Sequence, residues 1–127
     1  STMEYRFTKA DFEKEVLQSK EPVFIDFYAD WCGPCKQFSP VYEAASEKHS
    51  DIVFGKVDTE DQGQLAQAAG ITSIPTIMGF RGGILVYQQA GALREDQLET
   101  VISSIRELDM DKVRAEIAAA EGSAEKK

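Results

Sequence analysis

The hydrophobic residues of this chain follow two patterns that alternate along its length. Short runs that are mostly apolar and rich in β-branched and aromatic residues predict strands, and longer stretches with apolar residues three or four apart predict helices. The predicted strands cover residues 5–7, 23–29, 52–57, 75–80 and 84–89. The predicted helices cover residues 9–17, 34–48, 62–69 and about 94–108. The expected order is therefore β-α-β-α-β-α-β-β-α.

Local signals support the ends of several of these elements. Thr8 offers an N-cap oxygen for the first helix, and Asp11 follows at the third helical position. Pro34 stands in the first turn of the second helix, where its missing N–H costs no hydrogen bond. Gly82-Gly83 separates the last two strands and is typical of a tight hairpin turn.

This order predicts the α/β fold class. Strands that alternate with helices pair in parallel through right-handed crossovers, whereas a final hairpin has to be antiparallel. A single mixed β-sheet with helices on both faces satisfies both conditions. We expect one domain over residues 3–108, with Met3 as the native start and Ser1-Thr2 as a short non-native addition.

Residues 109–127 continue beyond the last predicted core helix. Met110, Val113 and Ile117 recur at helical spacing, and the sequence becomes polar from Glu121. We expect a C-terminal extension consisting of one or two amphipathic turns followed by a polar, frayed end.

Composition narrows the class of protein. The 127 residues are 43% hydrophobic and 28% charged, which is typical of a soluble globular domain. The net charge of −8 argues against nucleic-acid binding, and no apolar run approaches the ~20 residues that span a bilayer. The N-terminal residues lack the pattern of a secretory signal, so we expect a cytoplasmic protein, and we expect a monomer.

The two cysteines carry the clearest chemistry. Cys32 and Cys35 lie within Trp31-Cys-Gly-Pro-Cys-Lys36, where a buried strand ends and a helix begins. The free N–H groups and the dipole of the helix N-terminus favour a thiolate at Cys32, which predicts that it is the nucleophile of disulfide exchange. Cys35, one turn into the helix, is expected to be more buried and to resolve the mixed disulfide.

Two other interpretations of the pair are weaker. A structural zinc site needs four ligands, and His49 is the only other strong candidate, so we expect no metal. An inert structural pair is disfavoured because Gly33-Pro34 and the helix start hold both cysteines at a turn, and because so short a loop adds little stability. A Cys-x-x-Cys pair near a β-α-β pattern indicates redox chemistry instead.

Asp26 is an ionisable residue inside an apolar predicted strand. Burial should raise the pKa of its carboxyl, which suits a group that exchanges protons near neutral pH. We predict that Asp26 accepts the proton of Cys35, directly or through water. The alternative is a carboxylate satisfied by Lys56 or by backbone groups, and the charge of Lys56 could also tune Asp26.

Ile74-Pro75 stands at the start of the fourth predicted strand. Most X–Pro bonds are trans, so position alone predicts a trans bond here.

Together these separated motifs resemble the thioredoxin family. The resemblance runs from about Tyr5 to Leu108 and rests on the following segments: Phe24-Ile-Asp-Phe-Tyr-Ala29, Trp31-Cys-Gly-Pro-Cys-Lys36, Lys56 with Asp58, Ile74-Pro75-Thr76 and Gly91-Ala92. It implies the thioredoxin fold, a cis Pro75 beside the cysteines, and an Ile74 backbone that pairs with an extended substrate. The implied substrate-binding surface around Cys32 consists of Trp31, Gly33, Pro34, Ile74, Pro75 and Gly91.

The resemblance also implies a function. Its members with Gly-Pro between the cysteines are reductants, so we expect a general protein-disulfide reductase that cycles between dithiol and disulfide. Its partners would be disulfide-containing proteins and an NADPH-dependent thioredoxin reductase. The chain has no dinucleotide-binding motif and should carry no cofactor. A reductant dedicated to one partner and a thioredoxin-like binding or co-chaperone module stay open as alternatives. Tyr28 departs from the tryptophan that many members have there.

Overall fold

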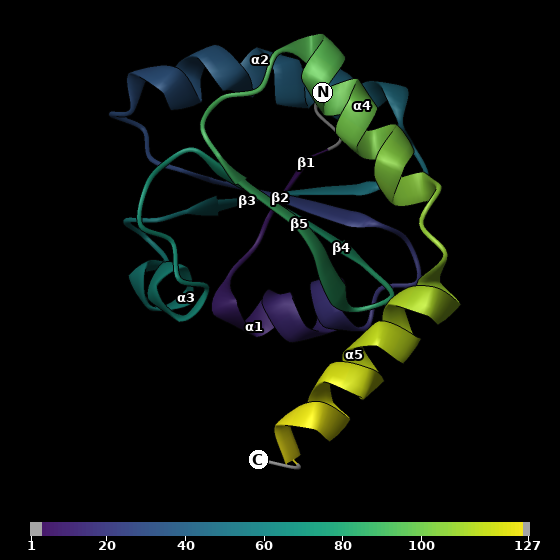
Figure 1. Cartoon of the computed structure of the whole chain (residues 1–127). Helices are drawn as coiled ribbons and strands as arrows, with labels where there is room; N and C mark the ends of the chain where they lie inside the picture. Colours follow the sequence, from purple (N-terminus) through teal and green to yellow (C-terminus); the bar gives the residue numbers. More distant parts are fainter. Residues whose placement is uncertain (1–3, 126–127) are drawn as a thin grey trace.

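The computed structural model describes residues 4–125 and contains one five-stranded sheet with helices on both sides (Figure 1). The elements in chain order are β1 (Glu4–Arg6), α1 (Lys9–Asp11), η1 (Phe12–Leu17), β2 (Val23–Tyr28), α2 (Gly33–Lys48), β3 (Val53–Asp58), α3 (Gly63–Ala68), β4 (Thr76–Arg81), β5 (Ile84–Ala90), α4 (Glu95–Arg106) and α5 (Met110–Glu125). The predicted order is confirmed as far as α4. The interpretation of Ser1-Thr2 lies outside the described residues.

The sheet has the strand order β1-β3-β2-β4-β5. β3 pairs in parallel with both β1 and β2, whereas β4 runs antiparallel to β2 and to β5. The mixed sheet predicted from the alternation of strands and helices is therefore confirmed. In this order β2 is the central strand, and all six of its residues are buried.

Each face of the sheet has its own hydrophobic core. Helices α2 and α4 cover one face, and α1, η1 and α3 lie on the other (Figure 1). The first core is built around Phe24, Phe38, Tyr42, Phe54, Ile77, Leu98 and Ile102. The second is built around Phe7, Val16, Ile25, Phe27, Val57, Leu65 and Met78. Alternate residues of β2 thus reach opposite cores, as the two-residue period of a strand requires.

The first predicted helix begins as expected and then widens. Thr8 and Asp11 form a capping box, in which the Thr8 N–H donates to Asp11 Oδ2 at 3.0 Å. From Phe12 to Leu17 the turns are of the wider π type, and the Gln18 N–H donates to the Glu13 carbonyl at 3.2 Å. Over two turns, periodicity in sequence does not distinguish this geometry from a regular α-helix.

The predicted hairpin is also present. Gly82 and Gly83 both have positive φ angles, 60° and 76°, which a tight hairpin turn requires and which glycine adopts without strain. A side chain at Gly83 would overlap the carbonyl of Leu17, so this turn packs directly on the end of η1.

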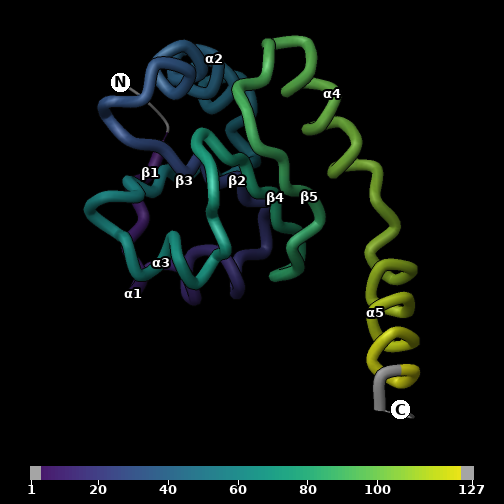
Figure 2. Tube along the Cα trace, turned by 60° about the vertical axis from the view of Figure 1, so that its left-hand side comes forward, coloured from purple at the N-terminus to yellow at the C-terminus, as the bar shows by residue number. Residues whose placement is uncertain are grey.

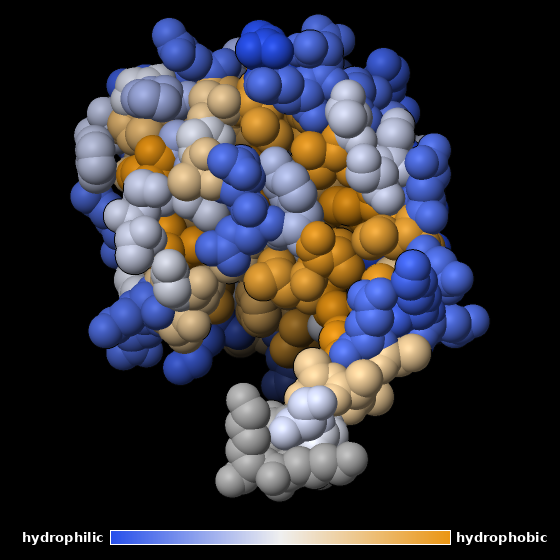
Figure 3. Space-filling view, in the orientation of Figure 1, coloured by the Kyte–Doolittle hydropathy of each residue, from blue (hydrophilic) through white to orange (hydrophobic). Residues whose placement is uncertain are grey.

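Helix α5 is longer than the sequence led us to expect. It continues through the polar residues after Glu121 and ends at Glu125, more than four turns from its start. Its alanines favour a helix even where the side chains are not buried. The hydrophobic stripe therefore stops where the sequence becomes polar, but the helix continues. Figure 2 shows α5 projecting from the rest of the chain, and Figure 3 shows a hydrophobic area on the surface beside it.

Arg81 fixes the junction between α4 and α5. Its Nη1 donates to the carbonyl oxygens of Ile105, Arg106 and Leu108 at 2.9, 3.2 and 2.7 Å. Carbonyls at the end of a helix lack the donors of a following turn, and within the described residues only Ile105 of these three also accepts from a nearby backbone N–H, that of Leu108 at 3.3 Å. The guanidinium supplies the missing donors and favours the negative helix end. Among the described residues, no helix is both long enough and apolar enough to cross a membrane.

Candidate active site

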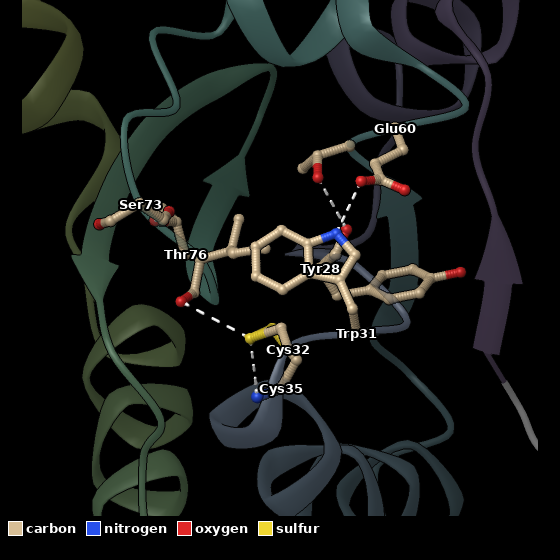
Figure 4. The surroundings of a disulfide bond; sticks show 9 residues. Tyr28, Trp31, Cys32, Cys35, Glu60, Ser73 and Thr76 are labelled. Carbon is tan, nitrogen blue, oxygen red and sulfur yellow. Dashed lines mark hydrogen bonds between the residues drawn. A yellow bond between two sulfur atoms is a disulfide. The ribbon is translucent and has the colours of Figure 1, made fainter.

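Cys32 and Cys35 form a disulfide at the start of α2 (Figure 4). The two Cα atoms are 5.2 Å apart, and Cys32 is the N-cap residue of the helix. The N–H of Cys35 donates to Cys32 Sγ at 3.2 Å, so an unpaired amide of the first turn points at this sulfur. The predicted position of Cys32 at the helix N-terminus is thereby confirmed.

The two cysteines are equally buried in the disulfide form, each with 4% of its surface exposed. We had expected Cys35 to be the more buried, but the bond between the two sulfurs places both against Tyr28 and Ala29, with Ile74 packed beside them. The neighbouring Trp31 is 66% exposed.

Glu60 holds the indole ring of Trp31. The ring lies beside the disulfide with its nitrogen turned toward Glu60, and Nε1 donates to Glu60 Oε1 at 2.6 Å (Figure 4). Sequence reasoning missed this contact, because the two residues are 29 positions apart and only the turn after β3 brings Glu60 to the site.

The Ile74–Pro75 peptide bond is cis. The trans bond predicted from position is wrong, and the cis bond implied by the family resemblance is confirmed. The carbonyl oxygen of Ile74 lies 3.8 Å from Cys32 Sγ. The N–H of Gly91 donates to the Pro75 carbonyl at 2.8 Å, so the end of β5 is held next to the cis peptide bond.

The residues predicted to bind substrate therefore come together from three parts of the chain. Trp31, Gly33 and Pro34 flank the disulfide and are exposed, Ile74 is partly exposed, and Pro75 is buried. The exposed residues Trp31, Gly33 and Pro34 thus surround Cys32, and the backbone carbonyl of Ile74 lies close to its sulfur. The binding role of these residues stays a prediction.

Asp26 lies in the centre of the sheet and is 1% exposed. It is the direct neighbour of Lys56 in the parallel register of β2 and β3, yet neither carboxylate oxygen has a hydrogen-bond partner. The alternative in which Lys56 or backbone groups satisfy this carboxylate is therefore not realised. Desolvation raises the pKa of Asp26 to about 7, while the charge of Lys56 lowers it and that of Glu4 raises it.

A cavity of about 130 Å³ connects Asp26 to Cys35. Asp26, Cys35, Ser39 and Lys56 all line it, and this volume is sufficient for water. Lys56 Nζ lies 4.6 Å from the centroid of the Tyr28 ring, so the aromatic residue at position 28 forms a wall of the cavity and holds this lysine by a cation–π contact. Sequence reasoning identified three of these four groups and missed Ser39.

Within the residues that the structure describes, no three His, Cys, Asp or Glu side chains are grouped so that they could hold a metal ion. The groups that the structure places at the site are the two sulfurs, the helix N-terminus and the buried carboxyl of Asp26.

Comparison with known proteins identifies the family. A protein-family model described as Thioredoxin matches residues 4–104. The chain belongs to the thioredoxin family. It is 56% identical to a Streptomyces coelicolor protein provisionally named thioredoxin 2, over 93% of this chain and 86% of that protein. It is 41% identical to the thioredoxin of Porphyra purpurea, over 76% of this chain and 91% of that protein.

Solved structures agree with this assignment. Malassezia sympodialis thioredoxin, described as a member of a pan-allergen family, superposes with a TM-score of 0.72 at 34% identity, covering 82% of this chain and 91% of that chain. Plasmodium falciparum thioredoxin gives the same TM-score and identity over 79% and 97% of the two chains. The protein thus has the thioredoxin fold and is a thiol–disulfide oxidoreductase whose redox pair is Cys32–Cys35.

The Streptomyces relative also shares part of the C-terminal extension. The matched region covers 118 residues, and only 108 residues precede the extension, so at least ten residues of 109–127 lie within the match.

Proposed function

We propose that this family member is a general protein-disulfide reductase of the cytoplasm. The observation that carries the proposal is the unpartnered Asp26 carboxyl, which lines the same cavity as Cys35. A group with a pKa of about 7 next to the second thiol suits a reaction in which that thiol must lose its proton at neutral pH. A purely structural pair or a binding module would have no use for this buried carboxyl, whose desolvation is costly.

The exchange takes place in two steps. The Cys32 thiolate attacks a disulfide of the partner protein, so that a Cys32–partner bond forms and one partner sulfur leaves as a thiolate. Cys35 then gives its proton to Asp26, directly or through water in the cavity, and its thiolate attacks Cys32 Sγ. This second step releases the other partner thiolate and forms the Cys32–Cys35 disulfide, so two electrons pass to the partner.

Other residues position these groups. The helix N-terminus and the Cys35 N–H stabilise negative charge on Cys32 Sγ. Lys56 favours the ionised form of Asp26 and so tunes the proton acceptor. An extended substrate segment pairs with the backbone of Ile74, while Trp31, Gly33, Pro34, Pro75 and Gly91 form the surface against which it lies.

The dithiol has to be regenerated by a separate electron donor. We assign this role to an NADPH-dependent thioredoxin reductase, because the chain has no dinucleotide-binding motif of its own. The Gly-Pro dipeptide between the cysteines supports the reducing direction, since it adds no positive charge that would stabilise the thiolate and make the disulfide more oxidising.

A coupled assay tests this function. The protein is mixed with NADPH, a purified bacterial thioredoxin reductase and insulin, and NADPH consumption is followed. We expect turnover with wild type and none with the Cys32→Ser, Cys35→Ser double variant. Cys35→Ser alone should accumulate a mixed disulfide through Cys32, visible as a mass increase that dithiothreitol removes.

A redox titration complements the assay. Trp31 is the only tryptophan, so its fluorescence reports the state of the adjacent pair. A midpoint potential of about −270 mV supports a reductase, whereas one of about −180 mV would mean that the protein donates disulfides instead.

A further inference from the structure

Helix α5 carries an apolar stripe that the domain covers only at its beginning. Met110 is buried against the domain, but Val113 is half-buried, and Ile117 and Ala120 are exposed. The spacing of these four residues is three, four and three, which is the spacing of positions a and d in a coiled coil. A helix with this pattern is stabilised when a second helix lies along the stripe.

The stripe forms one wall of an open apolar groove of about 340 Å³. The residues that line it are Leu85 and Val86 of β5, Leu108, and Val113, Glu116, Ile117 and Ala120 of α5, so Glu116 is the one charged residue among them. Leu85 is 46% exposed and Ile117 is 38% exposed, although both are large and apolar. The hydrophobic area beside α5 in Figure 3 lies over this edge of the sheet. The groove therefore has two mainly apolar walls, one from β5 and one from α5.

We propose that a second copy of this chain occupies the groove, with the two α5 helices packed antiparallel in a two-fold symmetric dimer. A helix of the same sequence supplies the matching apolar stripe, and an isologous contact of this kind closes on itself. This dimer replaces the monomer that the sequence led us to expect.

The charges beside the stripe favour this partner and this orientation. Arg114 and Glu121 lie along the same edge of the stripe, at equal distances on either side of a point just after Ile117, which is the middle residue of the uncovered part (Val113, Ile117 and Ala120). Antiparallel pairing of two copies places Arg114 of each copy opposite Glu121 of the other, which gives two attractive pairs. Parallel pairing would instead place Glu116 opposite Glu121, a repulsive pair. Both Arg114 and Glu121 are exposed, and the guanidinium of Arg114 also pairs with the exposed Asp111 of its own helix at 2.9 Å.

The dimer leaves the redox site accessible. α5 begins next to the Gly82-Gly83 turn, since a side chain at Gly82 would lie 3.9 Å from Met110 Cε. Pro75 and Gly91, which border the disulfide, are at the opposite ends of β4 and β5. Disulfide exchange should therefore not depend on the association state.

Two alanines of α5 provide a matched test. Ala120 faces the groove, whereas Ala115 lies on the opposite side of the same helix and is exposed. Ala120→Glu should weaken dimerisation about tenfold or more, because it places a charge in the apolar contact, and Ala115→Glu should change it less than about twofold. Both substitutions add the same charge and keep a good helix former, which circular dichroism verifies. The dissociation constant is measured by sedimentation equilibrium.

A charge exchange tests the orientation. Arg114→Glu and Glu121→Arg should each weaken the dimer several-fold, and the double variant should restore it to within about twofold of wild type. A wild-type protein that stays monomeric up to about 1 mM, or an Ala120→Glu variant that dimerises like Ala115→Glu, would overturn the proposal. A double variant weaker than either single one would exclude antiparallel pairing. In every variant insulin reduction should match wild type.

Discussion

Asp26 and Lys56 are direct neighbours across β2 and β3, yet the carboxylate of Asp26 makes no hydrogen bond and the ammonium group of Lys56 lies over the ring of Tyr28. The lysine acts on Asp26 through its charge and not through a direct bond. This separation leaves the carboxyl free to take up and release a proton.

The pH dependence of stability should report the state of Asp26. Its pKa in the folded protein is about 7, above the ordinary value of 3.8, so between these values the folded protein holds a proton that the unfolded chain has released. The free energy of unfolding should therefore fall as pH rises from 4 to 7, by roughly 4 kcal/mol, and level off above about pH 7.

Asp26→Asn removes this proton uptake. We expect the free energy of unfolding of the variant to change little between pH 4 and pH 7 and to exceed that of wild type at pH 8. Glu13 is exposed, and the control variant Glu13→Gln should behave like wild type. Urea unfolding of the disulfide form at pH 5 and pH 8 measures the difference. Parallel pH profiles for Asp26→Asn and wild type would show that this carboxyl does not titrate in the predicted range.

The charges of Lys56 and Glu4 should shift the pKa of Asp26 in opposite directions. Lys56→Met removes a positive charge and should raise this pKa, whereas Glu4→Gln removes a negative charge and should lower it. NMR titration of the Asp26 carboxyl carbon measures both shifts directly. If the two variants move the pKa in the same direction, their effects come from altered packing and not from charge.

Two glycines should respond oppositely to the same substitution. A methyl group on Gly55 would overlap the ring of Phe7, so Gly55→Ala should destabilise the protein by about 1–3 kcal/mol. Gly63 lies in α3 with nothing near its position, and Gly63→Ala should stabilise the helix by about 0.5–1 kcal/mol. Thermal unfolding of the two variants under identical conditions tests the pair, and a Gly55→Ala variant as stable as wild type would contradict the packing described here.

Arg81 should contribute to stability out of proportion to its partial exposure. Arg81→Met removes the guanidinium donor from the carbonyls of Ile105 and Leu108, and we expect a loss of about 2 kcal/mol in the free energy of unfolding. Arg94 provides a control, because its pair with Asp96 is exposed and Arg94→Met should cost less than about 0.5 kcal/mol. Equal losses in the two variants in urea unfolding would show that Arg81 does not fix the α4–α5 junction.

The sequence by itself determined the order of the elements and the place of the redox pair. Buried runs such as Val23–Tyr28, the Thr8–Asp11 capping box and the Gly82-Gly83 turn act over a few residues, so they can be recognised in the sequence. Cys32 at the start of α2 follows from the same local signals. An ionisable residue within an apolar strand also indicated Asp26.

Only the tertiary structure decided how these parts act on one another. The missing partner of Asp26, the contact between Trp31 and Glu60, and the cis bond at Pro75 depend on segments that are distant in the sequence. The length and exposure of α5 also became known only from the structure. A helix of alanines and charged residues has the same sequence pattern whether or not another surface covers it. Local hydrogen bonds and side-chain periodicity are properties of neighbouring residues, whereas burial, charge coupling and docking depend on which elements the fold brings together.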